Sequence, residues 1–598
     1  MTSSSKGAWL YGPLPDLLLG CGLGYAILAA ALLSWGPAIQ SVLPFDLLPF
    51  VLLFTGAPHY GATLLRVYEK KEDFRKYLFF SLFASGLVWA LFCGGVYNRA
   101  LMHVLVTLYL SWSPWHYSGQ NYGIAIMLLL RRGLAIPAPA KRLLHASFTL
   151  SFLLALLGMH GAGSAVYVPG DGEPVQFLRL GIPDRIFGAA HSLVLVLFIA
   201  ATAGTFYQLK RRGSWRDLVP VVAMTLTQSL WFVVPEILGR WPDLLPGGGP
   251  FGPGNAAYTF AWVAVFHMVQ YLWVTSYYAE GSKLSLRHGT FYVKALLAGS
   301  AIWAIPALLF APTVLGAVPF DGGLGVLLAA AVNLHHFILD GAIWKLRDGA
   351  VARLLLRARG ATVDRGQAEN PAVRGLSRLR YAAWPVGAAS LAVLYVASWL
   401  SLFGVERAYE ANDLEGLKRA AGRERWIGRE GHRTKTYLAL LEAGTGDLAG
   451  AISSGEGAVA SFDTAFGWNH LGTIYEMAGR MDDAIDASRH AVAADAGYRQ
   501  AAIELSRRLV RAAEKRPERL DEAVAYARFM VEASGGLDAG QMFVLARALE
   551  LAGLPDEARS SAARAAALTK TLDPDLLGMI ESLLRRLDPP AKMHAPES

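Results

Sequence analysis

The chain has 598 residues, of which 54% are hydrophobic and only 17% are charged, and its formal net charge is +8. A typical soluble protein has roughly a quarter of its residues charged, so the composition excludes a disordered chain, a collagen and a purely soluble fold. The basic residues lie between apolar segments, as they do in cytoplasmic loops of membrane proteins, and they give no sign of nucleic-acid binding.

Acidic residues divide the chain into two parts. Residues 1–403 contain 17 of the 47 Asp and Glu residues, and the other 30 lie in residues 404–598. We therefore expect an all-α protein in which residues 1–403 form a polytopic transmembrane domain embedded in the lipid bilayer. Residues 404–598 are expected to form a soluble helical domain. Cys21 and Cys93 both lie in apolar segments, which excludes a disulfide framework and a cysteine-based zinc site.

Apolar segments long enough to span a bilayer recur along the first domain. They predict about eleven spanning helices, near residues 15–35, 42–66, 75–96, 99–130, 143–161, 186–207, 218–238, 256–279, 294–314, 321–345 and 381–402. Because no small-residue cleavage pattern follows Lys6, the first segment is expected to be an uncleaved membrane helix and not a signal peptide. Pro114 is expected to kink the unusually long fourth segment.

Lysine and arginine residues indicate the orientation of these helices. Loops after the even-numbered helices are rich in both, as in residues 66–76 and 131–142, whereas Gly/Pro-rich loops such as residues 246–250 follow odd-numbered helices. The positive-inside rule then predicts a cytoplasmic N-terminus. An odd number of spans places residues 404–598 on the extracytoplasmic side.

The C-terminal domain carries a repeat signature. The opening pattern of the tetratricopeptide repeat is reproduced by Trp468, Leu471, Gly472 and Tyr475. A Gly-x4-Ala-Ile pattern at Gly446 also recurs 33 residues later at Gly479. These patterns predict a tetratricopeptide-like array that binds a protein or peptide partner on its concave surface. Any other array of helical hairpins is the alternative.

Histidines occur inside four of the expected spanning helices. They are His59, His116, His267 and the adjacent pair His335 and His336. An ionisable side chain in a membrane helix costs about 2.5 kcal/mol or more when it is charged, so it usually faces a partner, a cavity or a metal. All four helices are even-numbered and run in the same direction, so their histidines can lie at overlapping depths. We predict that His59, His116, His267 and one of His335 and His336 share one metal ion. The alternative is that each is a hydrogen-bonded core residue.

The donor set indicates a transition metal. Imidazoles suit iron, copper and zinc, and a histidine site with open positions suits Fe(II) redox chemistry, so iron is favoured. A ligating imidazole usually donates its other N–H to a neighbouring acceptor. The expected neighbours of this kind are Gln120, Asn121, Tyr271 and Asp340. The sequence assigns no catalytic residue.

Short motifs around these histidines resemble those of the bacterial, bacteriorhodopsin-related β-carotene dioxygenases, membrane enzymes that make retinal. The motifs lie within residues 45–345, in the family's order, at residues 56–59, 115–117 and 266–267 and at His335 with Asp340. The resemblance implies a helix bundle in the cytoplasmic membrane of a bacterium. It also implies a histidine-ligated non-haem iron that splits an apolar polyene with O2.

Three positions differ from the family's pattern. Residues 61–64 contain no Asp where the family has one, Asn121 replaces an Asp, and Tyr271 replaces a second His. One ligand would then have to come from His336 or be absent. The aromatic residues Trp112 and Trp115 would line a slot for an apolar substrate or pack between helices.

Two other classes of function fit the same architecture. A multi-span glycosyltransferase with a repeat tail would need acidic residues in its outer loops, where the sequence offers Asp46, Asp171, Glu173, Glu236 and Asp243. A non-enzymatic protein would hold haem b between two histidines or act as a scaffold whose membrane part anchors the repeat domain.

Overall fold

The computed structural model describes residues 8–35, 47–69, 71–161, 175–241, 244–245, 256–281, 288–344, 349–356, 374–429, 431–494, 498–533, 536, 538–569 and 574–587. These residues are predominantly helical, and in them a single isolated bridge joins Gly161 and Ile182. The expected all-α class is confirmed. Several residues discussed above lie outside the described residues, namely Lys6, Asp46, Asp171, Glu173 and Asp243.

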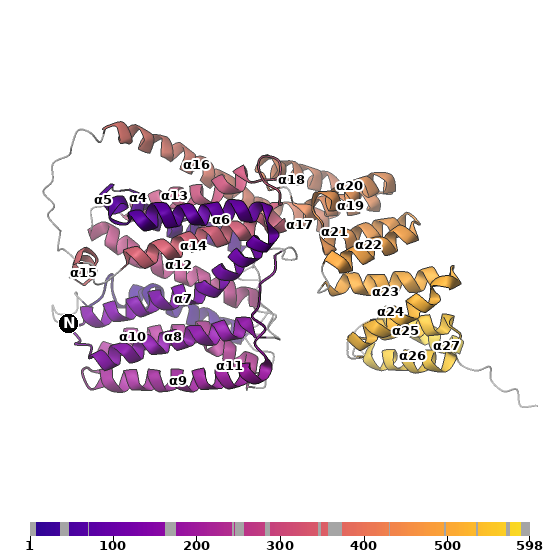
Figure 1. The fold of residues 1–598 in the computed structure, drawn as a ribbon, viewed down its shortest axis with the longest axis horizontal. Helices are drawn as coiled ribbons and strands as arrows, with labels where there is room; N and C mark the ends of the chain where they lie inside the picture. The colour runs from indigo at the N-terminus through magenta and orange to yellow at the C-terminus, as the bar shows by residue number, and fades with distance from the viewer. Residues whose placement is uncertain are drawn as a thin grey trace, which may run out of the picture. The chain divides into compact units, whose positions relative to one another are not determined.

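The chain forms two compact units. The first comprises Met1–Arg407 with Arg423–Arg429, and the second comprises Ala408–Gly422 with Glu430–Ser598. Up to the end of the apolar region, the helices in chain order are α1 (Pro13–Pro15), η2 (Asp16–Gly20), α2 (Leu23–Trp35), α4 (Leu48–Tyr68), α5 (Lys71–Lys76), η5 (Phe79–Ala84), α6 (Ser85–Tyr97), α7 (Arg99–Arg131), α8 (Ala138–His160), α9 (Asp184–Lys210), α10 (Trp215–Phe232), α11 (Val234–Arg240), α12 (Ala256–Gly281), α13 (His288–Leu309), η9 (Phe320–Leu324), α14 (Gly325–Ile343), α15 (Gly349–Leu356) and α16 (Arg374–Phe403). The long helices of the first unit run alongside one another (Figure 1).

Eight helices in the described part of the chain are long and apolar enough to cross a membrane. A ninth candidate is the pair Pro13–Gly20 and Leu23–Trp35, which is bent by 68°. The two remaining segments of the expected eleven are α7 and α12, which form long helices but are not among these candidates. Polar residues such as His116, Asn121 and His267 lower the mean hydropathy of these two helices. Packing against neighbouring helices therefore explains the place of α7 and α12 in the bundle better than apolar character does.

Glycines bring α4 and α13 into direct backbone contact. A Cβ at Gly61 would lie 1.8 Å from the carbonyl oxygen of Ala295, and a Cβ at Gly299 would lie 1.6 Å from that of Ala57. Small residues allow such close approach between membrane helices. This contact fixes the segment of α4 that carries His59.

Helix α7 begins at a capping residue and continues without a break past a proline. The side chain of Asn98 accepts a hydrogen bond from the backbone N–H of Leu101 at 3.0 Å and so caps the first turn. The helix then continues through Pro114 to Arg131. Its 33 residues correspond to about 50 Å at 1.5 Å per residue, so one helix carries residues from one face of the bundle to the other.

The remaining helices form antiparallel hairpins. They are α17 (Val405–Glu410), α18 (Leu414–Trp426), α19 (His432–Gly444), α20 (Leu448–Ser461), α21 (Ala465–Met477), α22 (Met481–Ala494), α23 (Arg499–Ala513), η11 (Pro517–Arg519), α24 (Leu520–Ala533), α25 (Ala539–Leu551), α26 (Pro555–Thr569) and α27 (Pro574–Leu587). The principal packed pairs are α19 with α20, α21 with α22, and α25 with α26. Leu471 and Tyr475 of the repeat signature pack against Ala484 of the partner helix.

A fully buried arginine joins two of these hairpins. Arg508 of α23 donates from Nε to Glu476 at 3.0 Å, from Nη1 to Ser488 at 2.5 Å and from Nη2 to Thr473 at 2.9 Å. A Cβ at residue 472 would lie 2.8 Å from Arg508 Nη1, so Gly472 leaves room for the guanidinium. The glycine of the repeat signature therefore has a packing reason.

Candidate metal centre

Four helices of the first unit each place one histidine in its interior. Helix α4 carries His59, α7 carries His116, α12 carries His267 and α14 carries His336. Helix α4 packs against both α12 and α14, and α14 also packs against α7. His59, His267 and His336 are only 1%, 1% and 2% exposed. Residues that are far apart in the sequence therefore meet in one buried place.

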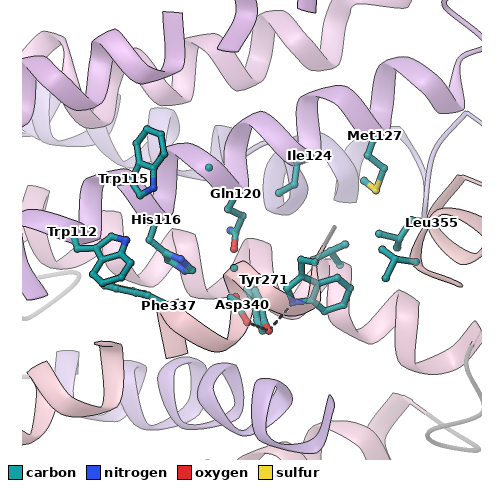
Figure 2. A pocket seen from close by; sticks show the side chains of 16 residues that line it. Trp112, Trp115, His116, Gln120, Ile124, Met127, Tyr271, Phe337, Asp340 and Leu355 are labelled. Carbon is teal, nitrogen blue, oxygen red and sulfur yellow. Dashed lines mark hydrogen bonds between the residues drawn. The ribbon is translucent and has the colours of Figure 1, made fainter. Parts of the chain in front are cut away.

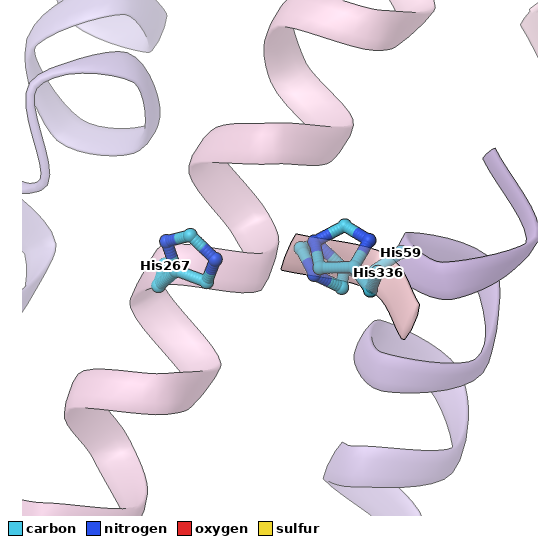
Figure 3. Close-up of side chains that lie close together, drawn as sticks. All are labelled: His59, His267 and His336. Atoms are coloured by element: carbon cyan, nitrogen blue, oxygen red, sulfur yellow. The ribbon is translucent and has the colours of Figure 1, made fainter. Parts of the chain in front are cut away.

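The nearest three imidazoles form a group that could hold a metal ion. His59, His267 and His336 each offer a ring nitrogen, and these three atoms lie within 4.8 Å of one another. Figure 3 shows His267 facing the overlapping rings of His59 and His336, each coming from a different helix. The ring centroid of His59 lies 5.2 Å from that of His267 and 4.3 Å from that of His336.

His116 completes a closed circle of four rings. Its centroid lies 5.0 Å from that of His267 and 5.1 Å from that of His336. His116, His336 and the Asp340 carboxylate form a second group whose ligand atoms lie within 4.8 Å of one another. His336 belongs to both groups, so the two groups are adjacent and share one imidazole.

Several ring nitrogens of this circle have no hydrogen-bond partner among the described residues. They are His59 Nδ1, His116 Nε2, His336 Nε2 and both nitrogens of His267. A buried polar group without a partner costs about 1–3 kcal/mol, so five such atoms in one place are expensive for the protein alone. A transition metal accepts the lone pairs of neutral imidazoles. The donor set therefore fits a metal ion.

A hydroxyl group orients His336. Thr63 Oγ1 lies 3.0 Å from His336 Nδ1 and donates to Asp340 Oδ1 at 2.9 Å. A threonine hydroxyl has one proton. When Thr63 gives that proton to the Asp340 carboxylate, His336 Nδ1 can donate to Thr63, which leaves the lone pair of His336 on Nε2, the nitrogen without a hydrogen-bond partner.

The same hydroxyl belongs to a larger network on α12 and α14. Tyr271 donates from its hydroxyl to Asp340 Oδ1 at 2.7 Å and lies 2.5 Å from Thr63 Oγ1, and Trp344 Nε1 donates to Tyr271 at 3.0 Å. These bonds occupy Asp340 Oδ1. The other oxygen, Oδ2, lies 3.4 Å from His336 Nε2 and is the one positioned for a metal.

The other residues expected near the metal occupy different positions. His335 lies in neither group, and its ring lies 6.2 Å from that of Trp89. Gln120 donates to the carbonyl oxygen of His267 at 3.2 Å, so it holds the backbone of α12 and not an imidazole. Asn121 donates to Gln228 at 2.8 Å, in a polar cluster that includes no histidine of the circle.

Two residues of the network were not anticipated from the sequence. Thr63 lies four residues after His59, one helical turn along the same face, and that spacing is the signal that could have found it. Trp344 directly follows the last residue of α14. It lies four residues after Asp340, so the same one-turn spacing from a selected residue could have pointed to it.

An apolar cavity adjoins the circle. It has a volume of about 340 Å³, and its lining includes His116, Tyr271 and Asp340 together with Trp112, Phe337 and Leu355. Figure 2 shows the residues of α7 following one another along the cavity, with Asp340 and Tyr271 across from them. Concave, mostly apolar cavities with a few convergent polar groups are typical of small-molecule sites. The arrangement brings a candidate metal ion and an apolar ligand next to each other.

No protein-family model matches the chain, and no curated protein matches its sequence. The resemblance to β-carotene dioxygenases therefore rests on the short histidine motifs alone.

Proposed function

We propose that this protein is a membrane-embedded, histidine-ligated metal enzyme of the oxygenase type that acts on an apolar substrate. The observation that carries the proposal is the circle of buried imidazoles with five unpartnered nitrogens. His59, His116, His267 and His336 would hold the metal, with Asp340 as a further ligand. Tyr271 and Thr63 would hold Asp340 and His336 in place.

Iron is the proposed metal. Sites of two histidines and one carboxylate with open positions are typical of non-haem iron oxygenases, and the present donor set likewise combines imidazoles with a carboxylate. The iron would supply the redox chemistry that activates dioxygen. The chain's own residues would position the ligands and keep water away, since the surrounding helices bury the site and the adjoining cavity is lined mainly by apolar side chains.

The geometry favours a non-haem metal ion over haem. In a haem the porphyrin nitrogens occupy the four equatorial positions, so only two axial positions are left for protein ligands. Three imidazole nitrogens that lie within 4.8 Å of one another do not suit that arrangement.

The finer topology belongs to the same proposal. Adding α7 and α12 to the nine candidate spans gives the eleven expected from the sequence, with the N-terminus cytoplasmic and the hairpin region extracytoplasmic. The hairpins would be tetratricopeptide-like and would bind a protein or peptide partner. The burial of Leu471 and Tyr475 between paired helices supports that assignment.

Metal analysis of the purified protein tests the proposal. We expect one iron per chain in detergent and no Soret band. Changing His59, His116, His267 or His336 to Ala should each lower the metal content, since each removes one ligand. His335→Ala is the matched control, because it removes an imidazole from the same helix outside the site, and it should keep the metal. Wild-type protein without stoichiometric transition metal, or equal metal in all variants, would overturn the proposal.

A further inference from the structure

The cavity beside the metal centre runs along one face of α7. Its α7 lining consists of Trp112, Trp115, His116, Gly119, Gln120, Gly123, Ile124 and Met127. These positions follow the three- and four-residue spacing of a single helix face. From the first to the last is about 22 Å at 1.5 Å per residue, so the cavity is an elongated groove.

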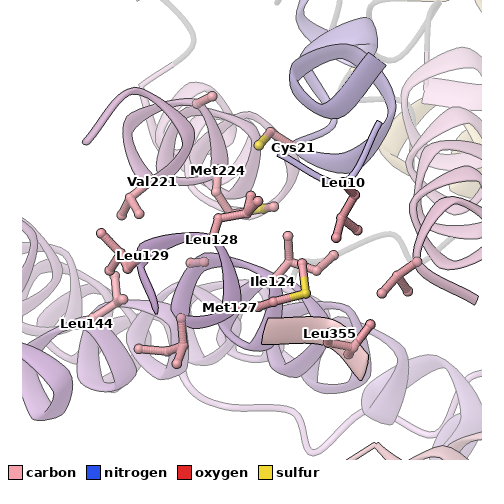
Figure 4. Packing of buried hydrophobic residues seen from close by; sticks show 14 of the residues in the cluster. Leu10, Cys21, Ile124, Met127, Leu128, Leu129, Leu144, Val221, Met224 and Leu355 are labelled. Atoms are coloured by element: carbon pink, nitrogen blue, oxygen red, sulfur yellow. The ribbon is translucent and has the colours of Figure 1, made fainter. Parts of the chain in front are cut away.

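One end of this groove is open and the other is closed. At the first end Trp112 and Trp115 are 39% and 40% exposed. At the other end Met127 is 2% and Leu355 4% exposed. Both belong to a buried hydrophobic cluster with Ile124, Leu10 and Cys21 (Figure 4). Arg131 Nη1 donates to the carbonyl oxygen of Leu355 at 2.6 Å and so fastens α15 over this end.

Glycines keep the groove clear between its ends. A Cβ added to Gly119 or Gly123 would meet no other atom within 4 Å, so nothing in the packing requires a glycine there. Gly123 lies seven residues beyond His116, about 10 Å along the helix, and four residues before Met127, about 6 Å. A large side chain at this position would divide the groove between the metal centre and its closed end.

The polar groups of the groove lie in its middle. They are His116, Gln120, Tyr271, Asp340 and Trp344, whereas the closed end presents Ile124, Met127, Val351 and Leu355. The side chains that line the closed end are all apolar, so burying an ionised or hydroxyl-bearing terminus against them is costly. The inserted end of the ligand is therefore hydrocarbon.

We propose that the length of the groove determines which position along a substrate chain reaches the candidate metal centre. A linear hydrocarbon chain enters between Trp112 and Trp115, inserts one end until it meets Met127 and Leu355, and so brings a fixed position along its length to His116 and Asp340. That position lies about 16 Å from the inserted end, from the eleven residues between His116 and Met127. Gly119 and Gly123 are then specificity-determining residues. The inference rests on the proposed function for its meaning, but the groove binds the chain whether or not a metal is present.

Photolabelling tests the proposal with the full-length protein in lipid nanodiscs. The probe is a linear alkane that carries a diazirine at its terminal carbon, and the labelled residues are identified by mass spectrometry. We expect adducts on Met127 and Leu355 that an excess of unlabelled linear alkane removes. A second probe with the diazirine in mid-chain should label residues near His116 instead. Labelling confined to exposed residues such as Leu108, without competition, would overturn the proposal.

A glycine pair provides the matched variants. Gly123→Leu should lower labelling at Met127 and Leu355 about tenfold or more, because a filled site rejects added methylene groups. Gly86→Leu is the control, since Gly86 of α6 also has open space around it but does not line the groove. Equal labelling in both variants would refute the assignment. If Gly123→Leu fails to fold, the labelling patterns of the two probes on the wild-type protein still test the proposal.

Metal content measured on the same samples separates the two proposals. Competable labelling at the closed end in a protein without metal would leave the groove standing and overturn the proposed function. Stoichiometric iron without such labelling would support the proposed function and overturn the proposal for the groove.

Discussion

Thr63→Val removes the hydroxyl that orients His336 while keeping nearly the same side-chain shape. In the wild-type protein Thr63 Oγ1 contacts His336 Nδ1 at 3.0 Å, Asp340 at 2.9 Å and Tyr271 at 2.5 Å. After the substitution Asp340 Oδ1 still accepts from Tyr271 at 2.7 Å. His336 Nδ1 would be left as a buried donor without a partner.

Two independent free-energy values agree on the size of the loss expected for Thr63→Val. An unpaired buried donor costs about 1–3 kcal/mol. Loss of the hydrogen-bond partner of a metal-ligating residue typically lowers metal affinity about 10–100-fold, which corresponds to about 1.4–2.7 kcal/mol. We therefore expect Thr63→Val to bind metal between ten and a hundred times more weakly, with the ligand set itself unchanged.

Competition against a chelator of known affinity measures this change in detergent-purified protein. Thr225→Val is the control, because Thr225 is also buried in a membrane helix but its hydroxyl bonds only to the carbonyl oxygen of Val221 on its own helix, at 2.8 Å. The control should bind metal like the wild-type protein. Equal affinity in Thr63→Val and Thr225→Val would refute the role of Thr63.

The remaining predictions concern the C-terminal region and the topology. We expect residues 430–590 to fold on their own with a helical circular dichroism spectrum and cooperative melting; an unfolded spectrum would contradict this. In that segment Arg508→Ala should destabilise by about 3–5 kcal/mol, because it removes one partner of a buried ion pair, whereas Arg480→Ala, in the exposed pair with Asp483, should lower the melting temperature far less; similar melting temperatures would count against the buried network. Burial, with a contribution from the charge of Arg508, lowers the pKa of His470 from 6.5 to about 4, so protonation favours the unfolded state and stability should fall as the pH drops from 6.5 towards 4; His470→Gln should weaken that dependence in denaturant titrations. A reporter that is active only in the cytoplasm should be inactive when fused after Gly404, and activity there would refute the extracytoplasmic assignment.

The sequence by itself was enough for the features that depend on local composition. Long apolar runs predict membrane helices because the bilayer interior tolerates backbone only when its hydrogen bonds are satisfied within the helix. The helices α4, α9 and α14 match such runs. Histidines inside these runs stand out because they are costly there, and four of the five selected residues meet at one site.

Tertiary structure decided what adjacent residues do. Neighbouring positions on an α-helix point about 100° apart, so a pair such as His335 and His336 cannot share one direction. The packing of α14 against α4 and α7 turns His336 towards the other three imidazoles and leaves His335 near Trp89. Gln120 and Asn121 are separated in the same way, one beside α12 and the other bonded to Gln228.

The spacing from His59 places Thr63 on the same helix face, but only the assembled helices show which groups its hydroxyl bonds. Its hydroxyl lies on α4, whereas its partners lie 208, 273 and 277 residues away on α12 and α14. A hydroxyl has no preference that the local sequence records, since it bonds to whichever groups the packing brings within about 3 Å. The groove along α7 has the same origin, because an unfilled space beside two glycines exists only once the neighbouring helices are in place.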